Sequence, residues 1–238
     1  MVKSFALKRW TLLSIGESKL NKTAIILGAT GLTGNILLNK LLGDNRYRNI
    51  KIFTRSPLRF ENPKVTEILC DLFELDNYKE NFHGDEVFCC IGTTTKKTPD
   101  KELYKKIDLG IPVSAAKLCK INGIKTIAII SATGANAKSS IFYNRTKGEM
   151  EEAVLEQKIE NTFILRPSMI GGNRKEFRIA EKIGSILMKV LNPLFVGSLR
   201  KYRLIDADII ANAMIKLANN GIDEQIIESD QIQELGRE

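Results

Sequence analysis

The feature that most constrains the fold is a glycine-rich turn, Gly28–Gly34, placed between an apolar run and a helical pattern. The run Ala24–Leu27 predicts a buried strand directly before the turn, and residues 35–42 continue with helical periodicity after it. Glycines let a backbone turn tightly near a pyrophosphate, and the N–H groups at a helix N-terminus attract the anion. The spacing G-x-x-G-x-x-G in this strand–turn–helix context therefore predicts a dinucleotide site rather than an ordinary turn.

Apolar runs and helical patterns alternate along most of the chain, which is typical of a parallel sheet covered by helices on both faces. The pattern predicts six strands, at Thr23–Gly28, Ile50–Thr54, Val65–Leu69, Glu86–Ile91, Lys125–Ile130 and Thr162–Leu165. It predicts helices between them, notably at Leu32–Leu42, Asp100–Asn122 and Tyr143–Gln157. The expected fold class is α/β, a Rossmann-type doubly wound parallel sheet with a small C-terminal substrate-side cap.

A length of 238 residues suits one domain with a short appendage. We expect an N-terminal extension at 1–21 and a single NAD(P)-binding domain at 22–238, with substrate-side elements from about 168 to 220. Within the latter, Arg174–Leu191 and Asp206–Asn219 have helical patterns. The tail Gly221–Glu238 is polar, and no element is predicted there.

Composition narrows the class of protein. Hydrophobic residues make up 43% of the chain, and no apolar run is long enough to predict a membrane span. The net charge of +8 raises the question of nucleic acid, but the basic clusters lack interleaved aromatic residues, so none is expected as a partner. The four cysteines form no C-x-x-C pair and read as reduced, which favours a cytoplasmic protein, and no metal site is predicted.

The residues after the second strand bear on the choice of dinucleotide. An NAD site commonly has an acidic residue there, whereas this chain has Thr54-Arg55-Ser56, a guanidinium between two hydroxyls. Because Arg offers a planar fork of donors to phosphate oxygens, Arg55 predicts NADP rather than NAD. After the third strand, Asp71 either accepts from the adenine amino group or caps the following helix, and both roles are compatible.

Three residues near the fifth predicted strand suggest acid–base chemistry. Ser131 stands at the end of that strand, while Tyr143 and Lys147 share one face of the next helix at i and i+4. A lysine one turn from a tyrosine lowers the pKa of the phenol and makes it a usable acid or base. The spacing alone is weak, since Tyr47 and Lys51 repeat it by accident, so the position after the fifth strand carries the argument.

Five stretches, in order and spacing, make the chain resemble the atypical short-chain dehydrogenase/reductases, specifically the Tat-interacting-protein-like oxidoreductases. They are Gly28–Gly34, Phe88–Thr94, Ile130–Ala135, Tyr143–Glu149 and Leu165–Pro167. The resemblance implies that Tyr143 donates a proton in reduction, that Lys147 holds the nicotinamide ribose and tunes Tyr143, and that Ser131 orients a carbonyl. Many members of this family have an asparagine where this chain has Asp108, which puts their proton relay in question here.

The sequence thus predicts an NADPH-dependent oxidoreductase that reduces a small-molecule carbonyl. Two alternatives stay open: a non-catalytic NADP(H)-binding regulatory protein, supported by Asp108, and an epimerase or isomerase that retains NAD, which Arg55 disfavours. A homodimer or a protein partner is left open. The predicted catalytic residues are Ser131, Tyr143 and Lys147. The predicted cofactor-binding residues are Gly28, Thr30, Gly31, Leu32, Thr33, Arg55, Asp71, Leu72, Gly92, Thr93, Lys147, Arg166 and Pro167.

Overall fold

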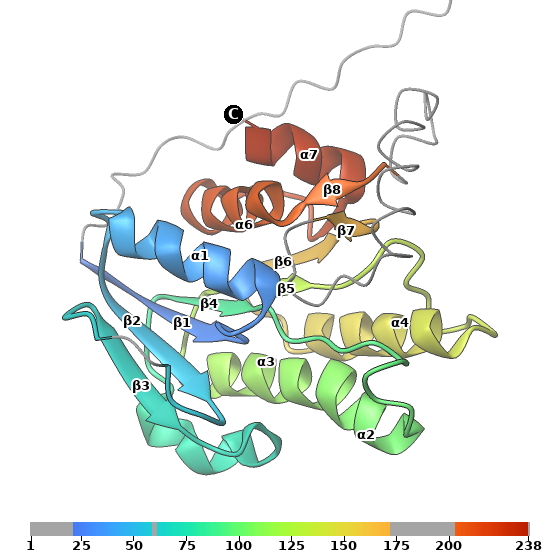
Figure 1. Cartoon of the computed structure of the whole chain (residues 1–238), viewed down its shortest axis with the longest axis horizontal. Coiled ribbons are helices and arrows are strands. Elements are labelled where there is room, and N and C mark those ends of the chain that lie inside the picture. Colours follow the sequence, from blue (N-terminus) through green and yellow to red (C-terminus); the bar gives the residue numbers. More distant parts are fainter. Residues whose placement is uncertain (1–20, 59–60, 172–202, 238) are drawn as a thin grey trace, which may run out of the picture.

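A seven-stranded parallel sheet forms the centre of the molecule, in the order β3-β2-β1-β4-β5-β6-β9 (Figure 1). The computed structural model of the chain describes residues 21–58, 61–171 and 203–237. The strands of the sheet are β1 (Lys22–Leu27), β2 (Tyr47–Thr54), β3 (Val65–Leu69), β4 (Glu86–Cys89), β5 (Thr126–Ile130), β6 (Asn161–Arg166) and β9 (Ile226–Glu228). A separate parallel pair joins β7 (Ile170–Gly171) to β8 (Ile205–Asp206). The predicted doubly wound Rossmann-type sheet is confirmed.

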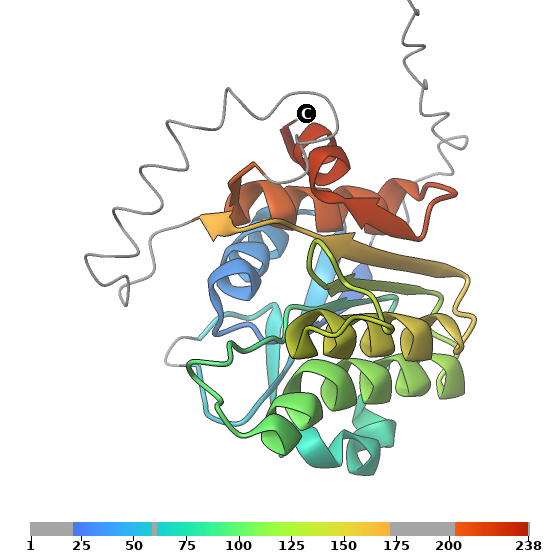
Figure 2. The ribbon, with the colours of Figure 1, turned by 90° about the vertical axis from the view of Figure 1, so that its right-hand side faces the viewer.

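Helices cover both faces of this sheet. They are α1 (Leu32–Gly43), the 3₁₀ segment η1 (Leu72–Asn81), α2 (Lys101–Lys105), the π-helical turn η2 (Lys106–Gly110), α3 (Ile111–Ile121), α4 (Phe142–Leu155), α6 (Ala207–Asn220) and α7 (Ser229–Arg237). Figures 1 and 2 show α1 and α6 on one face and α3 and α4 on the other, with α7 packed beside α6.

The strands divide their side chains between two hydrophobic cores because successive residues of a strand point to opposite faces. In β1, Ile26 packs with α1 and α6, including Leu37 and Met214. Its neighbour Ile25 packs on the other face with α3 and α4, including Leu118 and Val154. This double burial explains why the central strands are continuous apolar runs, without polar alternation.

The six predicted strands are all present, and most boundaries shift by one to three residues. The helix predicted at Asp100–Asn122 is instead three consecutive segments, because the π-helical turn η2 lies between α2 and α3. The tail after Gly221, for which no element was expected, contributes β9 and α7. The predicted N-terminal extension and the predicted helix Arg174–Leu191 lie outside the described residues. Within the described ranges, no helix is both long and apolar enough to cross a membrane.

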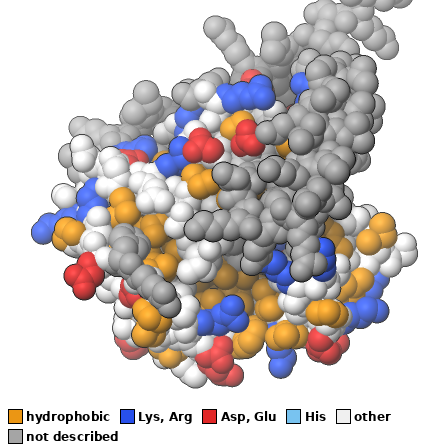
Figure 3. All heavy atoms as spheres, in the orientation of Figure 1, with side chains coloured by type: hydrophobic (Ala, Val, Ile, Leu, Met, Phe, Trp, Pro, Cys, Tyr) orange, Lys and Arg blue, Asp and Glu red, His pale blue; other side chains and the backbone are white. Residues whose placement is uncertain are grey.

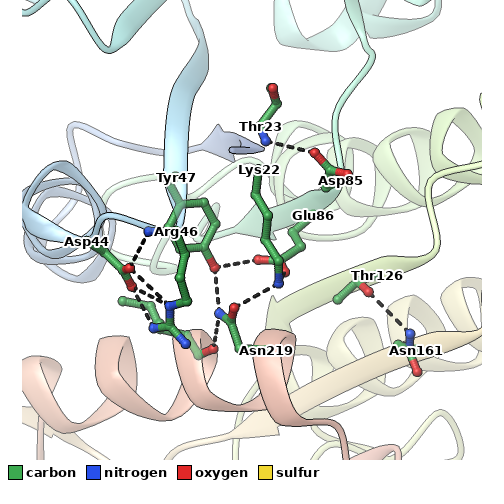
Figure 4. A network of polar contacts seen from close by, with 11 residues as sticks. Lys22, Thr23, Asp44, Arg46, Tyr47, Asp85, Glu86, Thr126, Asn161 and Asn219 are labelled. Carbon is green, nitrogen blue, oxygen red and sulfur yellow. Dashed lines mark hydrogen bonds and ion pairs between the residues drawn. The ribbon is translucent and has the colours of Figure 1, made fainter. Parts of the chain in front are cut away.

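A buried polar network ties the amino edge of the sheet to α6 (Figure 4). The Lys22 ammonium lies 2.5 Å from the Glu86 carboxylate, and the Tyr47 hydroxyl donates to the other oxygen of Glu86 at 2.5 Å. From α6, the Asn219 amide donates to the Tyr47 hydroxyl at 2.7 Å and accepts from Lys22 at 2.8 Å. Burial, the charge of Glu86 and the hydrogen bond to Glu86 all raise the pKa of Tyr47, so this tyrosine is a structural donor.

Charges of both signs are spread over the face seen in Figure 3. Among the described side chains of that face, Lys and Arg alternate with acidic and apolar groups and make no continuous basic surface. This mixed distribution is compatible with the sequence-based expectation that the chain has no nucleic-acid partner, which stays a prediction.

Candidate active site

A cleft of about 1220 Å³ lies at the carboxyl edge of the sheet, where open α/β sheets bind their ligands. Its walls come from the glycine turn and the start of α1, the segments that follow β4, β5 and β6, one face of α4 and the start of α6. The predicted site residues that line it are Thr30, Gly31, Leu32, Thr33, Gly92, Thr93, Ser131, Tyr143, Lys147 and Pro167.

The glycine turn has a geometry that other residues would not tolerate. Gly28 has a φ of +86°, a conformation that L side chains rarely adopt, and a Cβ there would lie 2.9 Å from the Cys90 carbonyl. A Cβ on Gly34 would lie 2.1 Å from the Gly28 oxygen, so the turn closes only with glycine at that position. Gly28 thus allows the turn to pack closely against the backbone that follows β4, and it does not itself line the cleft.

The first turn of α1 suits a phosphate group. Its N-cap residue is Gly31, which has no side chain to bond to the N–H groups behind it, and no acidic residue lies in that turn. Free N–H groups and the positive end of the helix dipole attract an anion at this position. The glycine cradle and the uncapped helix therefore fit the pyrophosphate of a dinucleotide.

Ser131, Tyr143 and Lys147 meet in this cleft, although β5 and α4 supply them separately. Ser131 directly follows β5 and is buried. Tyr143 and Lys147 lie one turn apart in α4, with Lys147 buried and Tyr143 partly exposed. The accidental pair, Tyr47 and Lys51, lies entirely within β2, and Tyr47 belongs to the amino-edge network.

Lys147 is paired with a buried carboxylate. Its Nζ lies 2.8 Å from Oδ1 of Asp108, which is fully buried in the π-helical turn η2. The other oxygen of Asp108 accepts from the Thr93 N–H at 2.7 Å, so Asp108 joins the lysine to the loop after β4. The sequence marked Asp108 as a departure from the family pattern but gave no sign of this ion pair.

The electrostatics at Tyr143 differ from the expectation that Lys147 lowers its pKa. Burial raises the pKa of Tyr143 above its ordinary value, the charge of Lys147 works against this, and the charge of Asp108 adds to it. The net direction is upward, because burial and Asp108 together outweigh the lysine. Tyr143 therefore holds its proton firmly at neutral pH.

Glu151 connects Ser131 to a chain of charges that sequence reasoning missed. The Ser131 hydroxyl donates a short hydrogen bond to the buried Glu151 carboxylate. Arg166 donates to both oxygens of Glu151 and also to Glu228 at 3.0 Å. The bond to Glu151 is the main cause that raises the pKa of Arg166. Glu151 could have been found from its spacing in the sequence, since it follows Lys147 by four residues and shares its helix face.

Five predicted cofactor-binding residues do not line the cleft, namely Gly28, Arg55, Asp71, Leu72 and Arg166. Arg166 is engaged by two carboxylates instead. Arg55 is exposed directly after β2, and Leu72 is buried in the core. Asp71 caps η1 by accepting from the Phe73 N–H at 2.9 Å, one of its two predicted roles. No group of side chains that could hold a metal ion occurs among the described residues.

Comparison with known proteins places this arrangement in a family context. A family model described as NAD(P)H-binding matches residues 28–181. The chain is 35% identical to protein HTATIP2 of Rattus norvegicus over 165 residues, which are 68% of each chain. It is 32% identical to protein FMP52, mitochondrial, of Candida albicans over 213 residues, covering 86% of this chain and 91% of the relative. These relatives confirm the resemblance to the Tat-interacting-protein-like group.

Solved structures agree with the fold at low sequence identity. MoeE5, solved in complex with UDP-glucose and NAD, superposes with a TM-score of 0.63 at 16% identity, covering 86% of this chain and 74% of that one. This likeness shows that the two chains share a fold.

The prediction of a cytoplasmic protein is wrong in the light of these relatives. Several FMP52 proteins that are 30–32% identical to this chain, from four fungal species, are named mitochondrial. Reduced, unpaired cysteines do not distinguish one reducing compartment from another, which is why the cysteine argument failed.

Proposed function

Since the chain belongs to the NAD(P)H-binding family, we propose that it reduces the carbonyl group of a small molecule with NADPH, with Tyr143 as the proton donor. The observation that carries this proposal is that Tyr143, Lys147 and Ser131 line the same cleft as the glycine turn. Any dinucleotide held at the start of α1 would thereby reach the residues able to move a proton.

The nicotinamide cofactor would supply the hydride to the carbonyl carbon. The chain's own residues do the rest. The start of α1 holds the pyrophosphate, and Lys147 lies one helical turn from Tyr143, where it can also reach the ribose. As the carbon takes the hydride, the Tyr143 hydroxyl gives its proton to the carbonyl oxygen, so the product is an alcohol. A tyrosine with a raised pKa is protonated and ready for that step.

Ser131 would orient the substrate oxygen, but its hydroxyl already donates its one hydrogen bond to Glu151. To donate to a carbonyl, the hydroxyl must exchange Glu151 for the substrate. While it is bonded to Glu151, its oxygen can only accept. Ser131 would therefore position the carbonyl only after this exchange, and we assign the proton transfer to Tyr143.

NADPH is the proposed cofactor because of the segment after β2. Arg55 is exposed, and both of its sequence neighbours carry hydroxyl groups and no carboxylate. Its guanidinium suits a 2′-phosphate. The Thr54 hydroxyl donates to the Ser56 carbonyl at 2.9 Å and helps to shape this turn.

The test is NADPH consumption by the purified chain across a panel of aldehydes and ketones. Tyr143→Phe should abolish consumption of any substrate that the wild type reduces, while leaving NADPH binding intact. Tyr78→Phe, in η1 outside the cleft, is the matched control and should keep full activity. NADPH binding without turnover of any panel member, or activity that survives Tyr143→Phe, would overturn the proposal.

A further inference from the structure

The ion pair between Asp108 and Lys147 is the most informative feature of the cleft that the proposed reaction does not use. Asp108 is fully buried; one of its oxygens accepts from the Thr93 N–H at 2.7 Å, and the other lies 2.8 Å from the Lys147 ammonium as an ion pair. The side chain of Lys147 is 4% exposed, so water screens this pair very little.

A local irregularity of the helix holds Asp108 in this place. The segment from Lys101 to Ile121 changes from α-helix to a π-helical turn at Lys106–Gly110 and back again. Such turns insert a residue into a helix and recur at functional sites. Here the turn places the Asp108 carboxylate between the loop after β4 and the cleft face of α4.

The position of this carboxylate changes what Lys147 can do for Tyr143. A lone ammonium would favour the phenolate of Tyr143, but a carboxylate 2.8 Å from that ammonium opposes its field. The other titratable groups at this point are Tyr104, whose ring centroid lies 6.5 Å from that of Tyr143, and Cys89 at the end of β4. Both are neutral at ordinary pH, since burial raises the pKa of each. The other charged side chains that line the cleft are Lys97, Asp206 at the end of β8, and Asp208 at the start of α6.

We propose that Asp108 is a positioning residue that neutralises Lys147 and so sets the pH at which Tyr143 releases its proton. Its catalytic meaning rests on the proposed function. By keeping Tyr143 protonated, Asp108 extends to higher pH the range in which the proton needed for carbonyl reduction is present. Asp108 acts through Lys147 and Tyr143 and needs no contact with the substrate.

The experiment is an ultraviolet absorbance titration of tyrosinate from about pH 7 to about pH 12, with Tyr143 isolated as the difference between each protein and its Tyr143→Phe form. In the wild type, less than half of Tyr143 should be ionised at about pH 10, the ordinary midpoint of tyrosine. Asp108→Asn keeps an oxygen for the Thr93 N–H and should lower the midpoint of Tyr143 by about one unit or more. Circular dichroism along the titration monitors folding.

Glu149→Gln is the matched control, because it also removes one negative charge, in this case from α4. Glu149 pairs with Lys105 at 3.0 Å and does not line the cleft, so the Tyr143 midpoint should stay within a few tenths of a unit. An unchanged or raised midpoint in Asp108→Asn would overturn the proposal. So would a wild-type midpoint well below 10, which needs no variant of Asp108 and decides the question even where Asp108→Asn fails to fold.

The titration needs no substrate, so its result is separate from the proposed reaction. A shifted midpoint without carbonyl reduction removes the proposed function and keeps the assignment of Asp108. Where a substrate is found, the alkaline limb of kcat/KM for reduction should move to lower pH in Asp108→Asn by the same amount as the Tyr143 midpoint.

Discussion

The Ser131 hydroxyl donates its one hydrogen bond to Glu151, which lies one helical turn beyond Lys147 on α4. Arg166 contacts both oxygens of that carboxylate, and Glu228 holds Arg166 from the edge strand β9. A cleft residue is thus fixed by contacts that extend to the far edge of the sheet. The geometry of Ser131 depends on three side chains outside the proposed reaction.

Replacing Glu151 with Gln should destabilise the protein by about 1–3 kcal/mol, because a buried group that accepts from Arg166 and Ser131 loses its charge. Equilibrium unfolding in urea measures the change. Glu152→Gln, at the exposed next position of α4, is the control and should be near neutral. A loss below about 0.5 kcal/mol for Glu151→Gln would show that the network contributes little.

Gly34→Ala should disrupt the glycine turn, since its Cβ would lie 2.1 Å from the Gly28 oxygen. We expect NADPH binding to weaken by at least about tenfold, with a loss of stability, because the turn must open to admit the methyl group. Gly43→Ala, at the other end of α1, meets no atom within 4 Å and should leave binding unchanged. Titration of cofactor fluorescence compares the two, and equal effects would contradict the assigned role of the turn.

Arg55→Ala should weaken NADPH binding by about tenfold, the cost of a lost charge-assisted hydrogen bond to phosphate, and leave NADH binding nearly unchanged. Calorimetric titration with each cofactor measures the selectivity directly. Arg48→Ala, at an exposed arginine within β2, controls for net charge. A parallel loss of both affinities in Arg55→Ala would remove Arg55 from the choice of cofactor.

Tyr47→Phe should cost about 1–3 kcal/mol of stability, because it leaves a buried oxygen of Glu86 and the Asn219 amide short of a partner. Thermal and urea unfolding report the loss, with Tyr78→Phe as the control. If Tyr47→Phe is as stable as the wild type, water replaces the missing hydroxyl and the network is less important than its burial indicates.

Local pattern was enough to predict the architecture of the sheet. Strands buried on both faces, such as Thr126–Ile130, are apolar throughout, and the glycine spacing marks the start of α1. The strand β9 was missed because three residues carry no periodicity and only pairing with β6 defines them. The π-helical turn was missed because the apolar spacing of Asp100–Asn122 continues through it.

The candidate site was predictable only in part. Tyr143 and Lys147 share a helix face, so their spacing was informative, and Ser131 was placed by the end of its strand. The pairing of Asp108 with Lys147 and of Glu151 with Ser131 joins residues that are 39 and 20 positions apart, by the numbers of the paired residues. The first contact arises from the packing of η2 against α4, and the second from the position of α4 beside the end of β5; no local pattern encodes either.

Ile25 and Ile26 pack in two different cores, and this determines which part of the cleft a core substitution affects. The helix that begins at the glycine turn rests on one side of the sheet, and the helix that carries Tyr143 rests on the other. The proposed pyrophosphate site and the proposed proton donor therefore rest on separate hydrophobic cores. A cavity beneath α1 should displace the pyrophosphate site more than Tyr143, while a cavity beneath α4 should displace Tyr143 more than the pyrophosphate site.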